Sequence, residues 1–203
     1  MNTIDNLIGR VPPLLRYSLA ALLLCGLILA TVVQRAAILR SGQEARLEVV
    51  PVDPHDLFRG DYVVLGYRIG TINMPPDVPM SFTRGQQVFV TLRPDGSNKA
   101  QAVAISAERP PVSGTDILIA GVVSAASTCQ LNEAGVSDCK LGRRAVGVRY
   151  GLESYFVPEG EGKKIELTPK ALLEVVAAVA PSGQAAIKRL LIDGKPVYDE
   201  PPY

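Results

Sequence analysis

The chain has 203 residues, of which 47% are hydrophobic but only 5% aromatic, and none is Trp. Its formal net charge is +1 and its mean hydropathy is +0.19. This composition excludes a disordered chain, a collagen-like chain and a small disulfide-rich scaffold. The near-neutral charge excludes the basic surface expected of a nucleic-acid-binding protein. The length suits one ordinary domain with an additional segment.

An uncharged apolar run occupies residues 17–34, between Arg16 and Arg35. In a helix it would cover about 27 Å, close to the hydrocarbon thickness of a bilayer, and it has no polar face. It is also longer than the apolar part of a signal peptide, which favours an uncleaved anchor in the lipid bilayer over a cleaved leader. We therefore predict a cytoplasmic leader over residues 1–16, a transmembrane helix over 17–34 and a helical extension or linker over 35–46.

The charges that flank the run give a nearly tied count of Arg on its two sides. The short leader and the long C-terminal part favour export of the latter. Residues 1–40 contain four Arg and one Asp, so residues 41–203 carry a net charge of −2. The exported part is thus mildly acidic, which again argues against nucleic acid as a partner.

Cys129 and Cys139 bracket a short polar segment of this exported part, whereas Cys25 lies in the predicted span. A disulfide that closes such a loop stabilises a protein by roughly 2–4 kcal/mol in an oxidising compartment. A zinc pair is the alternative, but the other two ligands it needs are missing nearby. We expect a periplasmic disulfide.

Beyond residue 46 the hydropathy alternates with a period of two. In residues 62–69, one face carries Val63, Leu65, Tyr67 and Ile69, which we predict to face the core. Turn residues between apolar runs predict hairpins at residues 94–96 and 193–194. The Ala-rich residues 171–180 permit a helix, but their Val content favours a strand paired with residues 185–191. Further strands are expected at residues 47–52, 87–92, 100–107, 116–125 and 143–150. The predicted fold is mainly β, with one compact, largely antiparallel domain over residues 47–203.

Two blocks of this domain resemble a known family. Residues 60–67 read Gly-Asp-Tyr-Val-Val-Leu-Gly-Tyr, and residues 150–160 read Tyr-Gly-Leu-Glu-Ser-Tyr-Phe-Val-Pro-Glu-Gly. The first block resembles the signature of the bacterial GDYXXLXY family at every fixed position, and the second is similar to a later segment of that family. The resemblance implies a membrane-anchored protein and supplies neither a reaction nor a cofactor.

The first block allows a structural and a functional interpretation. Structurally, Gly60 and Asp61 form a turn that leads into a core strand, and a buried Tyr67 hydroxyl needs a hydrogen-bond partner. Functionally, three carboxylates and the only His of the chain could bind a hard cation or perform acid–base chemistry. These ligand candidates are Asp53, His55, Asp56 and Asp61.

The second block interleaves aromatic and acidic residues. They could line a groove for a ligand or partner, or the aromatic residues could fill the core beneath solvated carboxylates. The partner-surface candidates in and next to the two blocks are Tyr62, Arg68, Tyr150, Glu153, Tyr155 and Glu159.

Known catalytic constellations find little support in the sequence. A Ser–Lys pair would need a Ser shortly before Gly60, and a Ser-His-Asp triad would need His55 together with a nucleophile elbow that is missing. We therefore expect a membrane-tethered periplasmic binding or accessory domain of the bacterial inner membrane, a non-catalytic subunit of an integral-membrane assembly without a cofactor. The alternatives are a periplasmic enzyme or cation-binding protein that uses residues 53–61, and a purely structural stalk.

Overall fold

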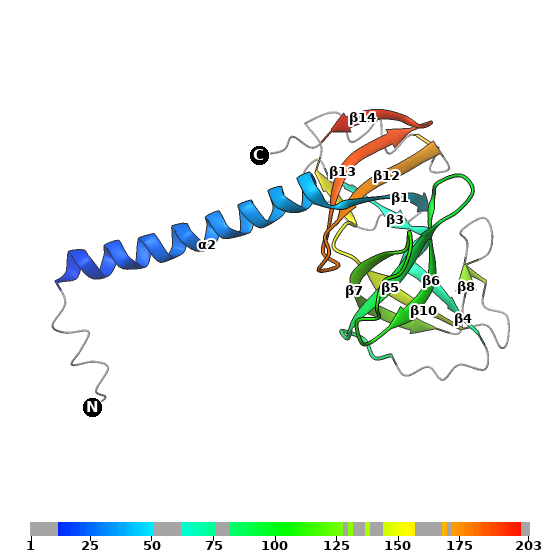
Figure 1. Ribbon diagram of the computed structural model, residues 1–203, viewed down its shortest axis with the longest axis horizontal. Coiled ribbons are helices and arrows are strands. Elements are labelled where there is room, and N and C mark those ends of the chain that lie inside the picture. Colours follow the sequence, from blue (N-terminus) through cyan, green and yellow to red (C-terminus); the bar gives the residue numbers. More distant parts are fainter. Residues whose placement is uncertain are drawn as a thin grey trace. The chain divides into compact units, whose positions relative to one another are not determined.

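The computed structural model describes residues 12–50, 62–75, 82–127, 130–131, 137–138, 144–156, 168–169 and 172–199. The chain divides into two compact units, and the second unit begins at Ile38. A long helix dominates the first unit, and antiparallel strands form the second (Figure 1).

Helix α2 extends from Pro13 to Ser41 and begins with a proline, the residue whose fixed φ angle and missing N–H suit the first helical position. Its 29 residues are long and apolar enough to cross a membrane or to serve as a signal sequence. No other part of the described protein covers the large apolar side chains along most of its length, and Leu14 and Leu22 are 81% and 72% exposed. In a soluble protein such a surface would be costly, since burial of apolar area drives folding.

The last helical turn belongs to the β domain. Ile38 and Leu39 are buried and pack against Ala178 and Ala186. Gly42, the residue after the helix, donates its N–H to the carbonyl of Ile38 at 2.9 Å. A Cβ atom on Gly42 would lie only 2.6 Å from that same oxygen, so no larger residue fits without movement of the backbone. The segment expected as a helical extension or linker is therefore helix through Ser41 and strand from Gln43.

Two five-stranded antiparallel sheets form the second unit, which confirms the predicted mainly β fold. The first sheet has the strand order β14-β13-β12-β1-β3 and the second has the order β4-β10-β7-β5-β6. Strand β1 follows the helix directly and lies within the first sheet, between β12 and β3.

The strands of the first sheet are β1 (Gln43–Val50), β3 (Gly66–Tyr67), β12 (Leu173–Val179), β13 (Ala185–Ile192) and β14 (Lys195–Asp199). The strands of the second are β4 (Thr71–Met74), β5 (Gln87–Pro94), β6 (Ala100–Ser106), β7 (Ile117–Ser127) and β10 (Arg144–Arg149). The remaining short elements are β2 (Tyr62–Val64), η1 (Arg68–Gly70), β8 (Gln130–Leu131), β9 (Ser137–Asp138) and β11 (Ser154–Phe156).

Both predicted hairpins and the strand at residues 171–180 are present. The β13–β14 turn places Asp193 and Gly194 at positive φ angles of 52° and 72°, the geometry of a tight two-residue hairpin. Strand β12 pairs with β13 as the Val-rich composition favours, with Val179 opposite Ala185. The alanines of β12 are buried rather than helical because the sheet packs on both of its faces there, with Ala177 and Ala178 fully inaccessible.

The predicted strand over residues 62–69 is divided. Strand β2 pairs with β11, whereas β3 pairs with β1, and Leu65 lies between the two. The chain then tightens into the turn η1 before it enters β4. A period-two pattern cannot distinguish this change of partners from one straight strand, because the side chains keep alternating through it. Leu65, Tyr67 and Ile69 are buried as expected.

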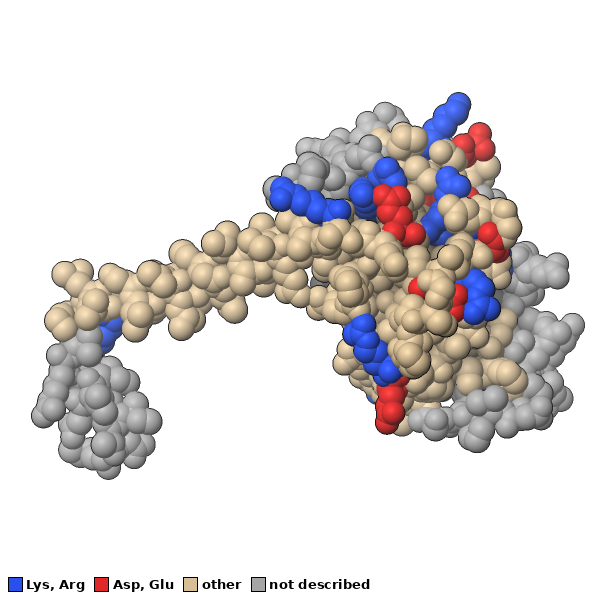
Figure 2. Space-filling model, in the orientation of Figure 1, with Lys and Arg blue, Asp and Glu red and all other residues tan. Residues whose placement is uncertain are grey.

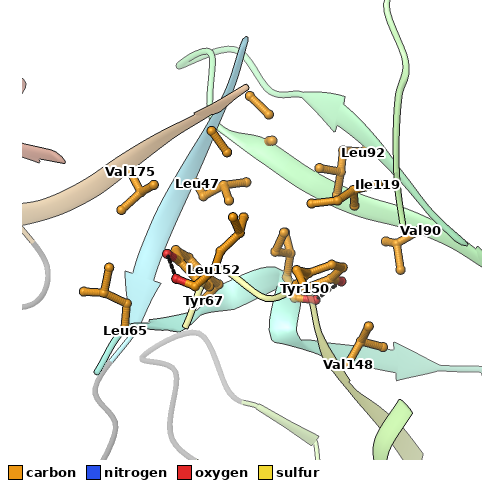
Figure 3. Packing of buried hydrophobic residues seen from close by; sticks show 14 of the residues in the cluster. Leu47, Leu65, Tyr67, Val90, Leu92, Ile119, Val148, Tyr150, Leu152 and Val175 are labelled. Atoms are coloured by element: carbon orange, nitrogen blue, oxygen red, sulfur yellow. Dashed lines mark hydrogen bonds between the residues drawn. The ribbon is translucent and has the colours of Figure 1, made fainter. Parts of the chain in front are cut away.

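The core lies between the two sheets (Figure 3). Leu47 and Val175 come from the first sheet, while Val90, Leu92 and Ile119 come from the second, and all five are essentially inaccessible to solvent. Leu65 and Leu152 extend the core to the segments that carry the two sequence blocks. Among the described residues, every buried side chain is apolar or aromatic, so burial of apolar area is the main stabilising contribution.

Candidate functional site

The two sequence blocks lie side by side in the structure. Strand β2 from the first block pairs with β11 from the second, with Val64 opposite Ser154 and Val63 opposite Tyr155. At the corner between β2 and β3, the N–H of Leu65 donates to the carbonyl of Glu153 at 2.8 Å. Residues nearly 90 positions apart in sequence therefore form one local structure, which we call the interlock and define as residues 64–69 with 150–155.

Two tyrosine hydroxyls tie the blocks together inside the core. Tyr67 donates to the carbonyl of Leu152, and Tyr150 donates to the carbonyl of Ile69, each at 2.7 Å. Both tyrosines are buried (Figure 3). The Tyr67 hydroxyl reaches the second block, and the Tyr150 hydroxyl reaches Ile69, two residues after the first block. The predicted need of a buried Tyr67 for a partner is thus met by backbone. Each hydroxyl thereby gives a backbone carbonyl in the core a hydrogen-bond donor.

The side chain of Glu153 stabilises the backbone of the second block. Its carboxylate accepts hydrogen bonds from the N–H of Tyr150 at 2.6 Å and from the N–H of Gly151 at 3.0 Å. Gly151 has a φ angle of +77°, a left-handed conformation that a residue with a side chain adopts at a cost. The carboxylate therefore stabilises the tight turn that aims Tyr150 inward.

Burial raises the pKa of both phenols, and the nearby charge of Glu153 raises them further. Tyr67 and Tyr150 are consequently protonated donors over the whole physiological pH range, which suits a structural role. Tyr150 and Tyr155 are 8% and 3% exposed, so the hypothesis that they form a partner surface is wrong for this folded state. The alternative expectation was that Tyr150 and Phe156 fill the core; it is confirmed for Tyr150, while the side chain of Phe156 lies outside the described residues.

Arg68, another partner-surface candidate, lies at the edge of the interlock. Its guanidinium forms a two-pronged ion pair with Glu48 of β1, with distances of 2.9 and 3.0 Å. The hydrogen bonds from Arg68 hold the pKa of the Glu48 carboxyl below its ordinary value, and the carboxylate in turn raises the pKa of Arg68. Both side chains keep roughly a third of their surface exposed, so the pair links β1 to the turn η1 at the protein surface.

The remaining candidates lie outside the described residues. These are Asp53, His55, Asp56, Asp61, Glu159, Cys129 and Cys139. The side chain of Tyr62 also lies outside the description, although its backbone pairs with Phe156 in β2 and β11. Cation binding at residues 53–61 therefore stays a prediction, which calorimetric titration with Ca²⁺, Mg²⁺ and Zn²⁺ would test. Cys25 is the one described cysteine, and it is free and exposed.

A ladder of ion pairs on the outer face of the first sheet was not anticipated. Glu44 accepts from Lys188 at 2.8 Å and from Arg189 at 2.6 Å. Glu174 pairs with Arg46 at 3.0 Å and with Lys99 at 3.1 Å. Blue and red side chains accordingly touch one another on the β domain in Figure 2. Charged and apolar residues alternate in residues 44–49, and this pattern predicts a strand with its charges on one face, because successive side chains of a strand point to opposite faces.

A comparison with family models identifies the relatives of the chain. The model of the GDYXXLXY protein family matches residues 24–190, which include the second half of the apolar run and nearly all of the β domain. The chain belongs to the GDYXXLXY family. No curated protein and no solved structure shows a significant match. The structure gives the Leu and the last Tyr of the GDYXXLXY signature, here Leu65 and Tyr67, a structural role. The N–H of Leu65 and the hydroxyl of Tyr67 donate hydrogen bonds to carbonyls of the second block.

Proposed function

We propose that the protein is a membrane-tethered accessory domain, a non-catalytic subunit of an integral-membrane assembly whose β domain lies in the periplasm. The observation that carries the proposal is the direct joint between the apolar helix and the first sheet. A single residue, Gly42, separates the end of α2 from the start of β1.

This joint limits where the β domain can work. Ser41 lies seven residues after Gln34, the end of the uncharged run, which corresponds to about 10 Å along a helix axis. Ile38 and Leu39 already pack against Ala178 and Ala186 of the domain, so only a few residues of chain separate the uncharged run from the β domain. A partner within reach must itself be at the membrane surface, which favours an integral-membrane protein.

The interlock supports the same function in another way. In it, Tyr67 and Tyr150 donate to backbone carbonyls and Glu153 accepts from backbone N–H groups. These hydrogen bonds fix the backbone conformation of the two blocks. A surface whose conformation is already fixed loses less entropy when it binds a partner.

Affinity purification of the full chain from membranes tests the proposal. We expect the same integral-membrane protein to accompany it in several mild detergents, at a constant ratio. A flexible Gly-Ser insertion after Ser41 should weaken this association, since it releases the domain from the membrane surface. The same insertion at Gly96, in the exposed β5–β6 turn, is the matched control and should leave the association intact. Recovery of the protein alone in every detergent would contradict the proposal.

The periplasmic location and the proposed Cys129–Cys139 disulfide have separate tests. Alkaline phosphatase fused after Tyr203 should be active in cells, because this enzyme folds only in an oxidising compartment. Thiol labelling of the denatured chain should modify one cysteine before reduction and three after it, since the chain has three cysteines. An inactive fusion would place the domain in the cytoplasm, and three reactive thiols before reduction would exclude the disulfide.

A further inference from the structure

A hollow of about 480 Å³ opens at the end of the β domain where helix α2 enters it. Both sheets and the loop between β6 and β7 contribute to it. Its lining includes Ser41, Gln43, Arg109, Val112, Ile117 and Pro181.

Hydrogen bonds hold the walls of this hollow together. Arg109 donates to the carbonyls of Pro181 and Ser182, which pins the β6–β7 loop to the β12–β13 turn. The N–H of Ala120 in β7 donates to the carbonyl of Gly183 in the same turn at 2.8 Å. Gly183 has a φ angle of +93°, and a Cβ there would lie 3.1 Å from Ala120, so this close approach depends on glycine. The hollow is therefore a built feature of the fold.

The strand register places the hollow at the helix-proximal end of the first sheet. Gln43, the first residue of β1, lies opposite Val179, and Val179 lies opposite Ala185. Ser41, at the rim, is about 10 Å along the helix axis from the end of the uncharged run. The headgroup layer on one side of a bilayer is roughly 5–8 Å thick, so the rim lies close to the membrane surface, just beyond that layer.

The chemistry at this end suits the surface of a membrane. Val112 is 47% exposed and follows two prolines, which gives the loop an apolar tip. Arg109 is exposed beside it, and its hydrogen-bond acceptors are neutral carbonyls that leave its charge uncompensated.

Few charged residues surround Arg109 in its loop. Within residues 107–115 the other charged residue is Glu108, which is exposed. Asp116, just beyond the loop, is already paired with Arg93 by two hydrogen bonds of 2.8 Å. Cationic and apolar groups together favour adsorption to anionic lipid.

We propose that this end of the domain docks onto an anionic phospholipid surface, with Val112 at the boundary of headgroups and acyl chains and Arg109 at a lipid phosphate. The inference rests on the proposed function in taking helix α2 to span the bilayer. It adds that the β domain itself contacts the lipid, through the β6–β7 loop.

The lack of Trp in the chain permits a clean test with single-Trp reporters. The full chain is reconstituted into lipid nanodiscs, and quenching of Trp fluorescence by brominated acyl chains is measured. Val112→Trp reports the loop. Val197→Trp is the matched control, because Val197 is also 47% exposed but lies in β14, which pairs with the helix-distal half of β13. Leu24→Trp, within the uncharged run, reports the span.

We expect strong quenching of Leu24→Trp in every lipid. Quenching of Val112→Trp should exceed that of Val197→Trp by about twofold or more, and it should rise further when phosphatidylglycerol replaces part of the phosphatidylcholine. Arg109→Gln in the Val112→Trp background should remove this rise, while Arg109→Lys should keep it because the charge is retained.

Three results are decisive. Equal, weak quenching of Val112→Trp and Val197→Trp with Leu24→Trp quenched would overturn the lipid contact and leave the proposed function intact. An unquenched Leu24→Trp would overturn the membrane span on which both proposals rest. Quenching of Val112→Trp that does not depend on phosphatidylglycerol would overturn the role of Arg109 at an anionic headgroup.

Discussion

The joint between helix and sheet and the interlock between the two sequence blocks both hold distant parts of the chain together, but by different physical means. At the joint, Ile38 and Leu39 lie on the small side chains of Ala178 and Ala186, and Gly42 lets the backbone pass closely. In the interlock, two buried phenols and one carboxylate bond to backbone groups. Close packing of small residues thus stabilises the joint, whereas buried hydrogen bonds stabilise the interlock.

This difference decides which substitutions each region tolerates. A close-packed contact between small residues resists any increase in size, because backbone atoms cannot move aside as side chains can. A buried hydrogen bond resists the loss of a single polar atom even when the shape is kept, because its partner is then left unbonded. Each region should therefore fail under a change that the other would accept.

Substitution of Gly42 by Ala should have the largest effect. The added Cβ would lie 2.6 Å from the carbonyl oxygen of Ile38 and 2.9 Å from the backbone N of Val179. We expect the free energy of unfolding of the β domain to fall by about 3 kcal/mol, measured by chemical denaturation of the full chain in detergent. Gly96→Ala is the control, since a Cβ at Gly96 meets no atom within 4 Å. Equal stability of the two variants would show that the joint is not close-packed.

Tyr67→Phe should break the interlock without any change in volume. The carbonyl of Leu152 loses its buried donor, and we expect a loss of about 2 kcal/mol in the free energy of unfolding. Tyr17→Phe is the matched control, because Tyr17 is 75% exposed on the helix. If Tyr67→Phe were as stable as this control, the carbonyl would be satisfied in another way and the hydrogen bond would not hold the two blocks together.

The sequence predicted the interlock only in part. Period-two alternation placed Leu65, Tyr67 and Ile69 on the buried face, and their burial confirms it. Alternation says nothing about which strands pair, so neither the change of partner at Leu65 nor the use of Leu152 as an acceptor could be derived. Glu153 was expected on a surface because carboxylates usually face water, and its backbone partners depend on a turn geometry that composition does not reveal.

The joint was harder to anticipate than the fold. Turn residues and Val-rich runs predicted the hairpins and strand β12, since these signals are local. The end of the helix at Ser41 depends instead on Gly42 and on Ala178 and Ala186, which are small, apolar and distant in sequence. Such residues have no distinctive local pattern, and their importance appears only once the strands are paired.

Substitution of Glu153 by Gln should cost less than the loss of Tyr67. The amide oxygen can still accept one of the two backbone hydrogen bonds, but the charge and the second acceptor are lost. A decrease of about 1 kcal/mol in the free energy of unfolding is expected, because hydrogen bonds to a charged group are stronger than neutral ones. Glu108→Gln, at an exposed position in the β6–β7 loop, should leave the free energy of unfolding unchanged. A Glu153→Gln variant as stable as the parent would mean that the carboxylate does not hold the turn at Gly151.

The smallest effect concerns pH and separates the two regions once more. Glu48 has a pKa below its ordinary value of 4.5 in the folded protein, chiefly because Arg68 donates to it. The unfolded chain therefore binds the proton more readily, so the contribution of the pair is present above pH 4.5 and is lost as the pH falls through the folded pKa. Arg68→Gln should lower the free energy of unfolding by about 0.5 kcal/mol at neutral pH, a modest value because the pair is partly exposed. This deficit should vanish in acid, whereas the deficit of Gly42→Ala should persist, because the joint is built from apolar residues that do not titrate. A deficit of Arg68→Gln that stayed constant from neutral pH into acid would show that Arg68 acts through packing of its apolar stem and not through its charge.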